Sequence, residues 1–436
     1  MVQDKLTSIA ERASVNKSVK FTSLAHLVNE ELLTLCYGEL KTNKATGIDG
    51  VTVKEYGLNL SENIKSLVER MKNKTYRCQP VRRVYIPKAN GVEKRGLGIP
   101  STEDKLVQLA IKKILEAIYD VDFIDSSHGF RPNRSCHTAL KQVDEIVMQN
   151  PVNCVVEVDI RKFFDNVSHY WLQRCLEERI NDPNFMWLIR QILKSGVMEK
   201  GEIEASIKGT PQGGIISPLL ANIYLHFVLD IWFERKFKAS SNQYMSMVRY
   251  CDDFVAFFES KTEADRFLVE LKERLEKFSL SIAEDKTRNI DFSRGIWNKN
   301  RCNNTKSETF NFLGFTLYCK ASRKGFLHLC MKTSRDNLRR KLKDTTEWIR
   351  KARNQHKLKD LMKTYKSKLT GHINYYGVSG NYGCVQEYYH TSLGIMFKWL
   401  NRRSQKKSFS FERFLKLINE FNIPKPKIVH RFYGGA

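Results

Sequence analysis

Three aspartates carry the strongest chemical signal in the sequence. Asp159 ends the apolar run at 154–160, and the adjacent pair Asp252 and Asp253 interrupts the apolar segment at 245–258. If these segments are neighbouring strands, the three carboxylates meet at one edge of a sheet. Hard oxygen ligands of this kind favour Mg²⁺. Two such ions, roughly 3.5 to 4 Å apart, can activate a hydroxyl group and neutralise a leaving pyrophosphate, so the pattern predicts a two-metal site for nucleotidyl transfer.

An Asp-Asp pair taken alone is more often an ordinary polar turn. A solvated turn has no reason, however, to lie between two apolar strands that are preceded by another apolar strand ending in an acid. The flanking residues therefore favour the metal site over the polar turn.

Strands and helices alternate around these acids. Apolar spacing predicts helices within residues 1–75, from 103 to 119 and over 217–237. Residues 82–99 form two predicted strands joined by an Asn-Gly turn, which gives a basic hairpin. The sequence therefore predicts an α+β fold.

The last third of the chain has a different composition, because residues 331–410 hold 19 Lys and Arg against 5 Asp and Glu. A helical stretch with a basic face is predicted from Lys332 to Lys368. Most aromatic residues of this region are expected in the core of a small helical bundle. They are Tyr375, Tyr376, Tyr382, Tyr388, Tyr389, Phe397 and Trp399. A run of basic residues suits contacts with phosphates and consists of Arg402, Arg403, Lys406 and Lys407.

Composition narrows the class of protein. The 436 residues include 42% hydrophobic residues, enough for two or three packed cores. A formal charge of +25 suits a partner that carries many phosphates. No apolar run is long enough to span a bilayer and the amino terminus lacks the apolar core of a signal peptide, so a cytoplasmic location is expected. Ten cysteines without a C-x-x-C pair indicate reduced thiols rather than a zinc site or disulfides.

The motifs along the chain resemble, in order and spacing, those of the reverse transcriptases encoded by bacterial group II introns. The motifs are FTSLAHL at 21–27, ATGIDGVT at 45–52, IPKANGVEKRGLGIP at 86–100, HGFRPNRSCHTAL at 128–140, VDIRKFFDNVSH at 158–169, GTPQGGIISPLLANIYL at 209–225, RYCDDFV at 249–255, AEDKTR at 283–288 and FNFLGF at 310–315. So many motifs in sequence are far more specific than any one of them. The resemblance implies a right-hand polymerase fold. Its parts would be a helical N-terminal extension at 1–75, fingers and palm at 76–315, and a basic helical thumb or maturase-like domain at 316–436.

The resemblance also implies roles at the acidic site. Asp159 and Asp252 would be the main metal ligands, Asp253 would complete the acidic pair, and the carbonyl of Ile160 would be a further ligand. Two Mg²⁺ ions are expected, with Mn²⁺ as an alternative. Tyr250 would lie near the primer end.

Other matching positions imply contacts with the incoming nucleotide. Lys88, Arg95 and Arg131 would meet the triphosphate, where Arg offers paired donors and Lys a compact charge. Gln212 would support template and nucleotide. Two further positions leave an alternative open. Phe164 would exclude a 2′-hydroxyl or would simply be a core residue beside Phe163, and Lys286 would lie near the triphosphate and primer or would be a solvated lysine.

The last third resembles the thumb of the same family through the motifs at 371–382, 399–414 and 424–430. Many members continue into a DNA-binding segment and a Cys-rich endonuclease, and this sequence stops before either, so independent cleavage of a DNA target is not expected. In the YCDD motif of this chain Cys251 follows the tyrosine, whereas alanine is commoner at this position in the family that the chain resembles.

The expected activity is RNA-directed DNA synthesis, with a structured RNA, an RNA template with a DNA primer, and dNTPs as partners. Three alternatives remain open. One is a stand-alone, defence-associated reverse transcriptase that copies a companion noncoding RNA. Another is an RNA-binding splicing cofactor with a vestigial site, against which the three intact acids argue. The third is an RNA-templated RNA polymerase, against which Phe164 argues.

Overall fold

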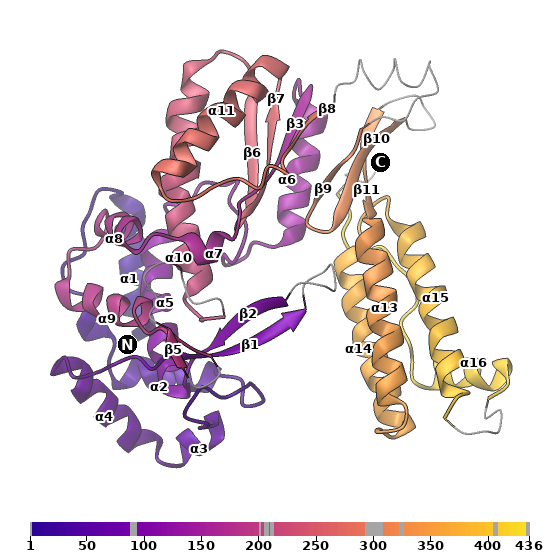
Figure 1. Cartoon of the computed structure of the whole chain (residues 1–436), viewed down its shortest axis with the longest axis horizontal. Helices are drawn as coiled ribbons and strands as arrows, with labels where there is room; N and C mark the ends of the chain where they lie inside the picture. Colours follow the sequence, from indigo (N-terminus) through magenta and orange to yellow (C-terminus); the bar gives the residue numbers. More distant parts are fainter. Residues whose placement is uncertain are drawn as a thin grey trace. The chain divides into compact units, whose positions relative to one another are not determined.

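The computed structural model describes residues 2–87, 94–199, 202–204, 209, 213–292, 308–321, 327–403 and 409–432. Contacts divide the chain into two compact units (Figure 1). Unit 1 comprises Met1–Ala139, Val158–Phe254 and Thr262–Arg288, and unit 2 comprises Leu140–Glu157, Val255–Lys261 and Asn289–Ala436. These units do not follow the predicted boundaries after residues 75 and 315, and the division into three domains stays a prediction.

Helix α5 (Thr102–Tyr119) is the best-buried helix at the amino-terminal side of unit 1, with eleven of its residues buried. Helices α1 (Val2–Val15), α2 (Glu30–Glu39) and α3 (Val53–Leu58) contact it, and α4 (Leu60–Lys72) packs on α2 and α3. The helices predicted within residues 1–75 and at 103–119 are therefore confirmed.

Side chains at the helix starts explain where these helices begin. Asn29 accepts a hydrogen bond from the amide of Leu32 at the start of α2. Thr52 and Glu55 form a reciprocal capping box at the start of α3. Such caps satisfy amide groups that have no partner within the helix.

The predicted basic hairpin is also present. Strand β1 (Val81–Pro87) pairs antiparallel with β2 (Lys94–Ile99), and the predicted Asn-Gly turn lies outside the described residues. On its other side β1 pairs in parallel with β4 (Val197–Glu199), which pairs with β5 (Glu202–Glu204). The sheet has the order β2-β1-β4-β5.

A second four-stranded sheet has the order β6-β7-β3-β8 and carries the predicted acids. Its strands are β3 (Cys154–Asp159), β6 (Met245–Tyr250), β7 (Asp253–Phe258) and β8 (Arg288–Asp291). Strand β3 lies beside β7, and Asp159 at the end of β3 is near enough to Asp252, just before β7, for their charges to interact.

The segment predicted as helical at 217–237 begins as α10 (Ser217–Leu225) and continues as two π-helical stretches, His226–Asp230 and Phe233–Phe237. A π-helical turn is wider than an α-helical one and shifts the side chains that follow it. Trp232, Phe233 and Phe237 of this segment pack on Phe267 of α11 (Lys261–Lys277). The other helices in this part of the chain are α6 (Cys136–Gln149), α7 (Phe163–Asn166), α8 (His169–Glu177) and α9 (Pro183–Leu193).

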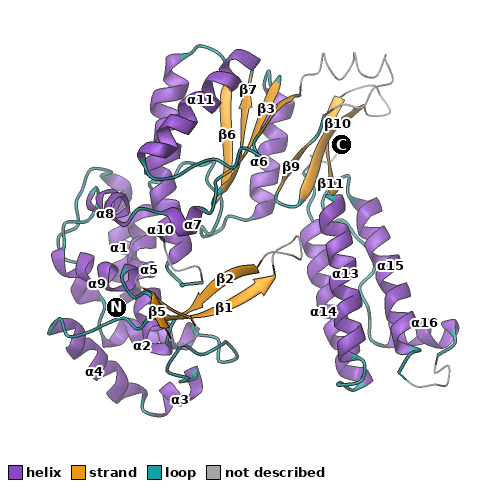
Figure 2. Ribbon diagram, viewed as in Figure 1, coloured by secondary structure: helices purple, strands orange, loops and turns teal. Residues whose placement is uncertain are grey.

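Unit 2 contains a three-stranded antiparallel sheet and a helical bundle (Figure 2). The strands are β9 (Phe310–Phe312), β10 (Phe315–Ala321) and β11 (Leu327–Thr333), in the order β11-β10-β9. The helices are α13 (Arg335–Ala352), α14 (Leu358–Tyr376), α15 (Tyr382–Leu400) and α16 (Phe411–Glu420). Together the helices and the mainly antiparallel sheets of the chain confirm the predicted α+β class.

The prediction of one helical stretch from Lys332 to Lys368 is wrong. Lys332 belongs to β11, which pairs with β10 in the three-stranded sheet, and the chain leaves the helix between α13 and α14. Of the aromatic residues predicted in the bundle core, Tyr376, Tyr388 and Tyr389 are buried, whereas Tyr382 is 47% exposed.

Five of the nine described cysteines are buried. Within the described ranges, no helix combines the length and the apolar character needed to cross a membrane.

Candidate active site

The pair Asp252 and Asp253 lies at the turn between β6 and β7. Cys251 precedes the pair with a φ of +59°, in the left-handed region that residues other than glycine rarely adopt. Its side chain is buried, whereas Asp252 and Asp253 are partly exposed. The turn thus buries the thiol and leaves two acidic residues within reach of a ligand. A backbone conformation of this kind persists only where the surroundings hold it.

Arg249 anchors this turn from inside the protein. It is completely buried and forms a two-point ion pair with the equally buried Asp230, at the end of the first π-helical stretch. Its guanidinium also donates to the side-chain oxygen of Asn222 at 3.0 Å, to the hydroxyl of Ser127 at 2.8 Å and to the carbonyl of Cys251 at 2.9 Å. These partners compensate the burial of a charge, which would otherwise be very costly.

The loop at 126–130 docks on the same strand. The amide of His128 donates to the carbonyl of Arg249 at 2.8 Å, and the amide of Arg249 donates to the carbonyl of Ser126 at 2.8 Å. Gly129 lies so close to the turn that an added Cβ would sit 2.5 Å from the backbone nitrogen of Cys251. Any larger residue at Gly129 would therefore displace the acidic turn.

Asp159 is held at the end of β3 by the segment at 281–286. Its carboxylate forms an ion pair with Lys286, with 2.8 Å between Oδ2 and Nζ. Its carbonyl accepts a hydrogen bond from the amide of Ala283 at 2.7 Å, and the amide of Arg161 donates to Ser281 at 2.8 Å. These two backbone hydrogen bonds involve the carbonyl of Asp159 and the amide of Arg161. They do not use the carbonyl of Ile160, which was predicted as a metal ligand.

The charges of Asp159 and of Arg95, which belongs to the basic hairpin, both act on the ionisation of Asp252. Burial raises the pKa of Asp252, the negative charge of Asp159 adds to the rise, and the positive charge of Arg95 on β2 opposes it. Arg95 is thus near enough to Asp252 to act on its ionisation. The two acids repel each other, and a bound cation would relieve that repulsion.

The donor chemistry at this turn fits a hard divalent cation. Asp159, Asp252 and Asp253 offer only oxygen ligands, as Mg²⁺ prefers. Across the part of the chain that the structure describes, no three His, Cys, Asp or Glu side chains lie close enough together to hold a metal ion, so the three acids are neighbours without forming a complete metal site. The ammonium group of Lys286 holds one oxygen of Asp159 instead.

Phe164 lies on α7, immediately after Asp159 and its loop. It is partly exposed, and its ring meets that of Phe163 edge-on at 5.3 Å between centroids. Gly209 packs at the end of α7, because its amide donates to the carbonyl of Val167 at 2.8 Å. Gly213, with a φ of +106°, approaches β2 closely, and an added Cβ would lie 2.6 Å from the carbonyl oxygen of Gly98. The glycines therefore let this segment pass close to two others.

Arg131 points into the protein rather than toward the acids. Its side chain is 6% exposed, pairs with the carboxylate of Asp120 at 2.8 Å and donates to the carbonyls of Asp120, Ile124 and Ser127. Most of its donors are therefore used to hold the loop that docks on β6. Contact between Arg131 and a triphosphate stays a prediction.

Three further predicted residues lie at the end of β6 and just beyond the end of α15. Tyr250 ends β6, and its ring lies 6.2 Å from that of Phe130. Arg402 is exposed and stacks over Trp399, whereas Arg403 donates to the carbonyl of His356 at 3.2 Å. The remaining predicted site residues fall outside the described residues. They are Lys88, Gln212, Lys406 and Lys407.

Sequence reasoning missed Arg249 and its partner Asp230. The available signals were an arginine within an apolar strand, two positions before Cys251, and an aspartate within an apolar helix. Both are unusual at buried positions unless they are paired.

Comparison with known proteins gives consistent matches. The family described as reverse transcriptase (RNA-dependent DNA polymerase) matches residues 86–317. Group II intron-encoded protein LtrA of Lactococcus lactis subsp. cremoris is 41% identical over 231 residues, which are 52% of this chain and 38% of LtrA. Protein YkfC of Escherichia coli (strain K12) is 31% identical over 359 residues, which are 74% of this chain and 90% of YkfC. The match therefore spans less than half of LtrA and most of YkfC.

Proposed function

Since the chain belongs to the reverse transcriptase (RNA-dependent DNA polymerase) family, in its group II intron type, we propose that it copies RNA into DNA. The reaction would take place at the site formed by Asp159 at the end of β3 and by Asp252 and Asp253 at the turn between β6 and β7. The observation that carries this proposal is the placement of the three acids on neighbouring strand ends, with the turn anchored by the buried Arg249. Such a buried anchor keeps the acids in position before any ligand arrives, and preorganised charge of this kind favours catalysis.

Bound divalent ions, Mg²⁺ by the oxygen character of the donors, would supply activation of the primer hydroxyl and charge neutralisation at the pyrophosphate. Asp159, Asp252 and Asp253 would hold them, with the carbonyl of Ile160 as a further ligand. Lys286 forms an ion pair with Asp159 and would turn toward the triphosphate when a nucleotide binds.

The surrounding residues would select and orient the nucleotide. Lys88 and Arg95 of the basic hairpin would bind the triphosphate, and Gln212 would support the base pair between template and nucleotide. Phe164 would lie under the sugar and exclude a 2′-hydroxyl by steric clash. Because its guanidinium bonds to its own loop, Arg131 would act as a positioning residue for the loop that supports the turn.

We further propose that the protein binds a structured RNA and, as an intron maturase would, assists its splicing. The formal charge of +25 and the concentration of basic residues at 331–410 support a large polyanionic partner. Tyr250 would lie at the primer end, and the run from Arg402 to Lys407 would contact phosphates. One relative is named nuclear intron maturase 4, mitochondrial, of Arabidopsis thaliana, and that name is consistent with such a role. This relative is 30% identical to the chain over 134 residues, which are 30% of this chain and 16% of the relative.

The test is primer extension on an RNA template with Mg²⁺ and dNTPs. The double variant Asp252→Asn/Asp253→Asn removes two metal-binding charges without removing side-chain volume. We expect it to lose DNA synthesis by more than about a hundredfold, because metal-assisted charge stabilisation contributes several kcal/mol to such reactions.

A matched control is Glu273→Gln/Glu276→Gln, which removes the same number of charges from the exposed face of α11. It should extend the primer as the wild type does. If folded wild-type protein yields no DNA on any RNA template, or if the aspartate variant remains active, the proposed polymerase site is wrong. An RNA-binding splicing cofactor would then be the better explanation.

A further inference from the structure

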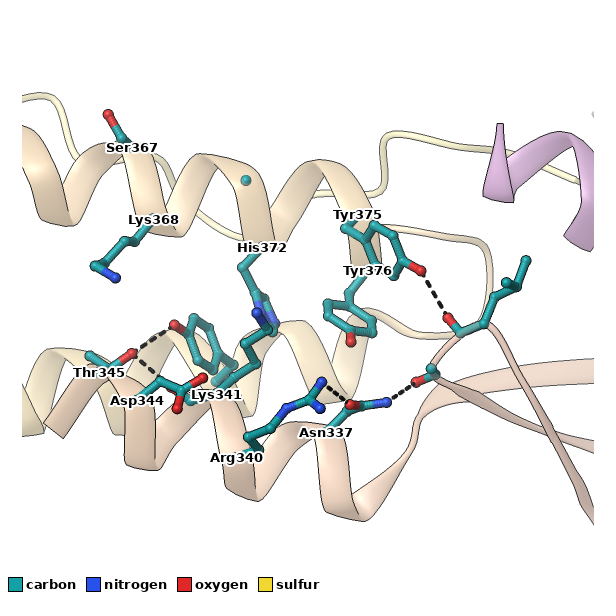
Figure 3. Close-up of a pocket in the computed structure, with 14 residues that line it drawn as sticks. Asn337, Arg340, Lys341, Asp344, Thr345, Ser367, Lys368, His372, Tyr375 and Tyr376 are labelled. Carbon is teal, nitrogen blue, oxygen red and sulfur yellow. Dashed lines mark hydrogen bonds between the residues drawn. The ribbon is translucent and has the colours of Figure 1, made fainter. Parts of the chain in front are cut away.

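A cavity of about 640 Å³ opens between helices α13 and α14 of unit 2 (Figure 3). A volume of this size lies within the range of small-molecule sites, roughly 300 to 1,000 Å³. Aromatic rings of Tyr376 and Tyr388 line it, and basic side chains from both helices lie around it. The basic residues are Arg340, Lys341 and Lys368. All of these residues belong to unit 2, and none belongs to the candidate active site.

His372 faces this cavity from α14 and has an unusual environment. Its residue is 6% exposed, and neither ring nitrogen has a hydrogen-bond partner among the described residues. The ring of Tyr388 stacks on it at 3.6 Å with an interplanar angle of 14°, and that of Tyr376 lies 4.8 Å away. Both ring nitrogens are themselves buried, so a ligand in the cavity meets the polar edge of the imidazole only when neighbouring side chains move aside.

The protonation state of His372 restricts the chemistry of that ligand. Burial and then the charge of Lys341 lower the pKa of His372 to about 3, so its ring is neutral at pH 7. A neutral imidazole has one nitrogen that donates and one that accepts. Buried polar atoms without partners are costly, so a fitting ligand supplies both an acceptor and a donor. A phosphate group at neutral pH is chiefly an acceptor, whereas the edge of a nucleobase offers both.

The basic residues supply the second half of the recognition. Lys341 is exposed, the ammonium group of Lys368 lies 5.3 Å from the ring centroid of Trp348, and the guanidinium of Arg340 is held by the side-chain oxygen of Asn337. Three cations and one carboxylate, that of Asp344, line this cavity, and the excess of positive charge suits a single phosphate group. One nucleotide combines this charge with a planar base of a size that the cavity accepts.

We propose that this cavity binds one unpaired nucleotide, with its base edge on His372 and its phosphate toward Arg340, Lys341 and Lys368. The unit could come from a free nucleotide or from a single-stranded stretch of RNA, and the basic composition of this region favours the strand. The site is distinct from the polymerase turn and needs no residue of it.

Selective ¹³C labelling of histidine gives a direct test on the whole protein. The chain has ten histidines, and the variant His372→Phe identifies the His372 signal while preserving an aromatic ring. We expect that signal to shift when the four ribonucleoside 5′-monophosphates or a single-stranded RNA hexamer are added. Ribose 5-phosphate and inorganic phosphate should need at least about a tenfold higher concentration. Tighter binding of the hexamer would identify the strand as the source, and equal binding would identify the free nucleotide; either supports the site.

Gly371 allows the cavity to be filled without loss of stability. It lines the cavity, and an added Cβ there has no atom within 4 Å among the described residues. Gly371→Met should weaken nucleotide binding at least about tenfold, while the better helix former leaves the melting temperature unchanged or higher. Gly394→Met is the matched control, since Gly394 is also helical, has equally open space and does not line the cavity.

Three results would overturn the proposal. They are an unmoved His372 signal with every nucleotide probe, equal responses to nucleotides and to ribose 5-phosphate, and unchanged binding in Gly371→Met. The variant Asp252→Asn/Asp253→Asn separates this site from the polymerase site. The shift of His372 should survive in that variant, and its loss would assign the effect to the polymerase turn instead.

Discussion

The ion pair between Lys286 and Asp159 is a contact of two partly exposed side chains, 65% and 40% exposed respectively. Such pairs contribute about 0 to 1 kcal/mol to stability. We therefore predict that Lys286→Met changes the free energy of unfolding by less than about 1 kcal/mol, yet slows DNA synthesis markedly, because the triphosphate loses a cation. Urea unfolding and steady-state primer extension at several dNTP concentrations measure the two effects.

A matched substitution is Lys277→Met, at the end of α11, outside the candidate active site. It should alter neither quantity by more than a small amount. If Lys286→Met instead destabilised the protein by several kcal/mol with a normal rate per folded molecule, Lys286 would be a structural residue rather than part of the nucleotide site.

Single residues differ in how far the sequence reveals them. The position of Asp159, Asp252 and Asp253 at strand ends of one sheet was predictable because apolar strands surround them, and their role as metal ligands stays a prediction. Arg131 was expected at the triphosphate from its motif, yet its guanidinium bonds to Asp120 and to nearby carbonyls. The motif specifies that an arginine is present but not which way its side chain points.

At the scale of elements, Arg249 and Asp230 join strand β6 to the π-helical stretch behind it. Both residues are completely buried. Removing one partner leaves an unpaired buried charge, so Arg249→Met or Asp230→Leu alone should lower the free energy of unfolding by about 3 to 5 kcal/mol. The double variant should lose much less than the sum, because no unpaired charge remains.

Chemical denaturation of the four proteins in this double-mutant cycle measures the coupling. Primer extension adds a second reading: the double variant should fold but lose activity, because Arg249 no longer holds the carbonyl of Cys251. Additive losses in the cycle would show that the pair does not anchor the turn.

His226 lies in the same π-helical stretch and makes stability depend on pH. Burial lowers its pKa to about 4, an effect that Asp230 opposes and that Arg249, Arg235 and Arg131 reinforce. The unfolded chain takes up the proton near pH 6.5 and the folded chain only near pH 4, so falling pH favours unfolding between these values. We predict that this group alone removes about 2 kcal/mol of stability between pH 7.5 and 5.0.

The variant His226→Phe tests this expectation, because a phenyl ring occupies similar space between Phe123 and Phe227 and cannot be protonated. Urea unfolding at pH 7.5 and pH 5.0 should show a smaller loss of stability on acidification than in the wild type. An identical loss in both proteins would mean that other groups set the pH dependence.

Elements with one clear period were predictable, and those with mixed signals were not. Strands β3, β6 and β7 follow their apolar runs, and α5 follows its helical spacing. The prediction of one helix from Lys332 to Lys368 failed because the many basic residues hide two changes, from strand β11 to helix α13 and from α13 to α14. The π-helical continuation of α10 was not predictable either, since apolar spacing indicates a helix without distinguishing α-helical from π-helical turns.

At the scale of the whole molecule, the formal charge of +25 predicts RNA binding that weakens steeply with salt. Each phosphate that the protein neutralises contributes about −0.7 to the slope of log K against log salt for a single strand.

Arg402 and Arg403 offer a matched pair, because Arg402 is exposed whereas Arg403 is half-buried and donates to the carbonyl of His356. Arg402→Gln should therefore make the slope shallower by about 0.7, and Arg403→Gln should change it less. Filter binding of a single-stranded RNA from about 50 to 200 mM salt measures the slopes. Equal slopes in the wild type and in Arg402→Gln would show that this end of α15 lies outside the RNA footprint, and would leave the basic face of α13 and α14 as the surface to test.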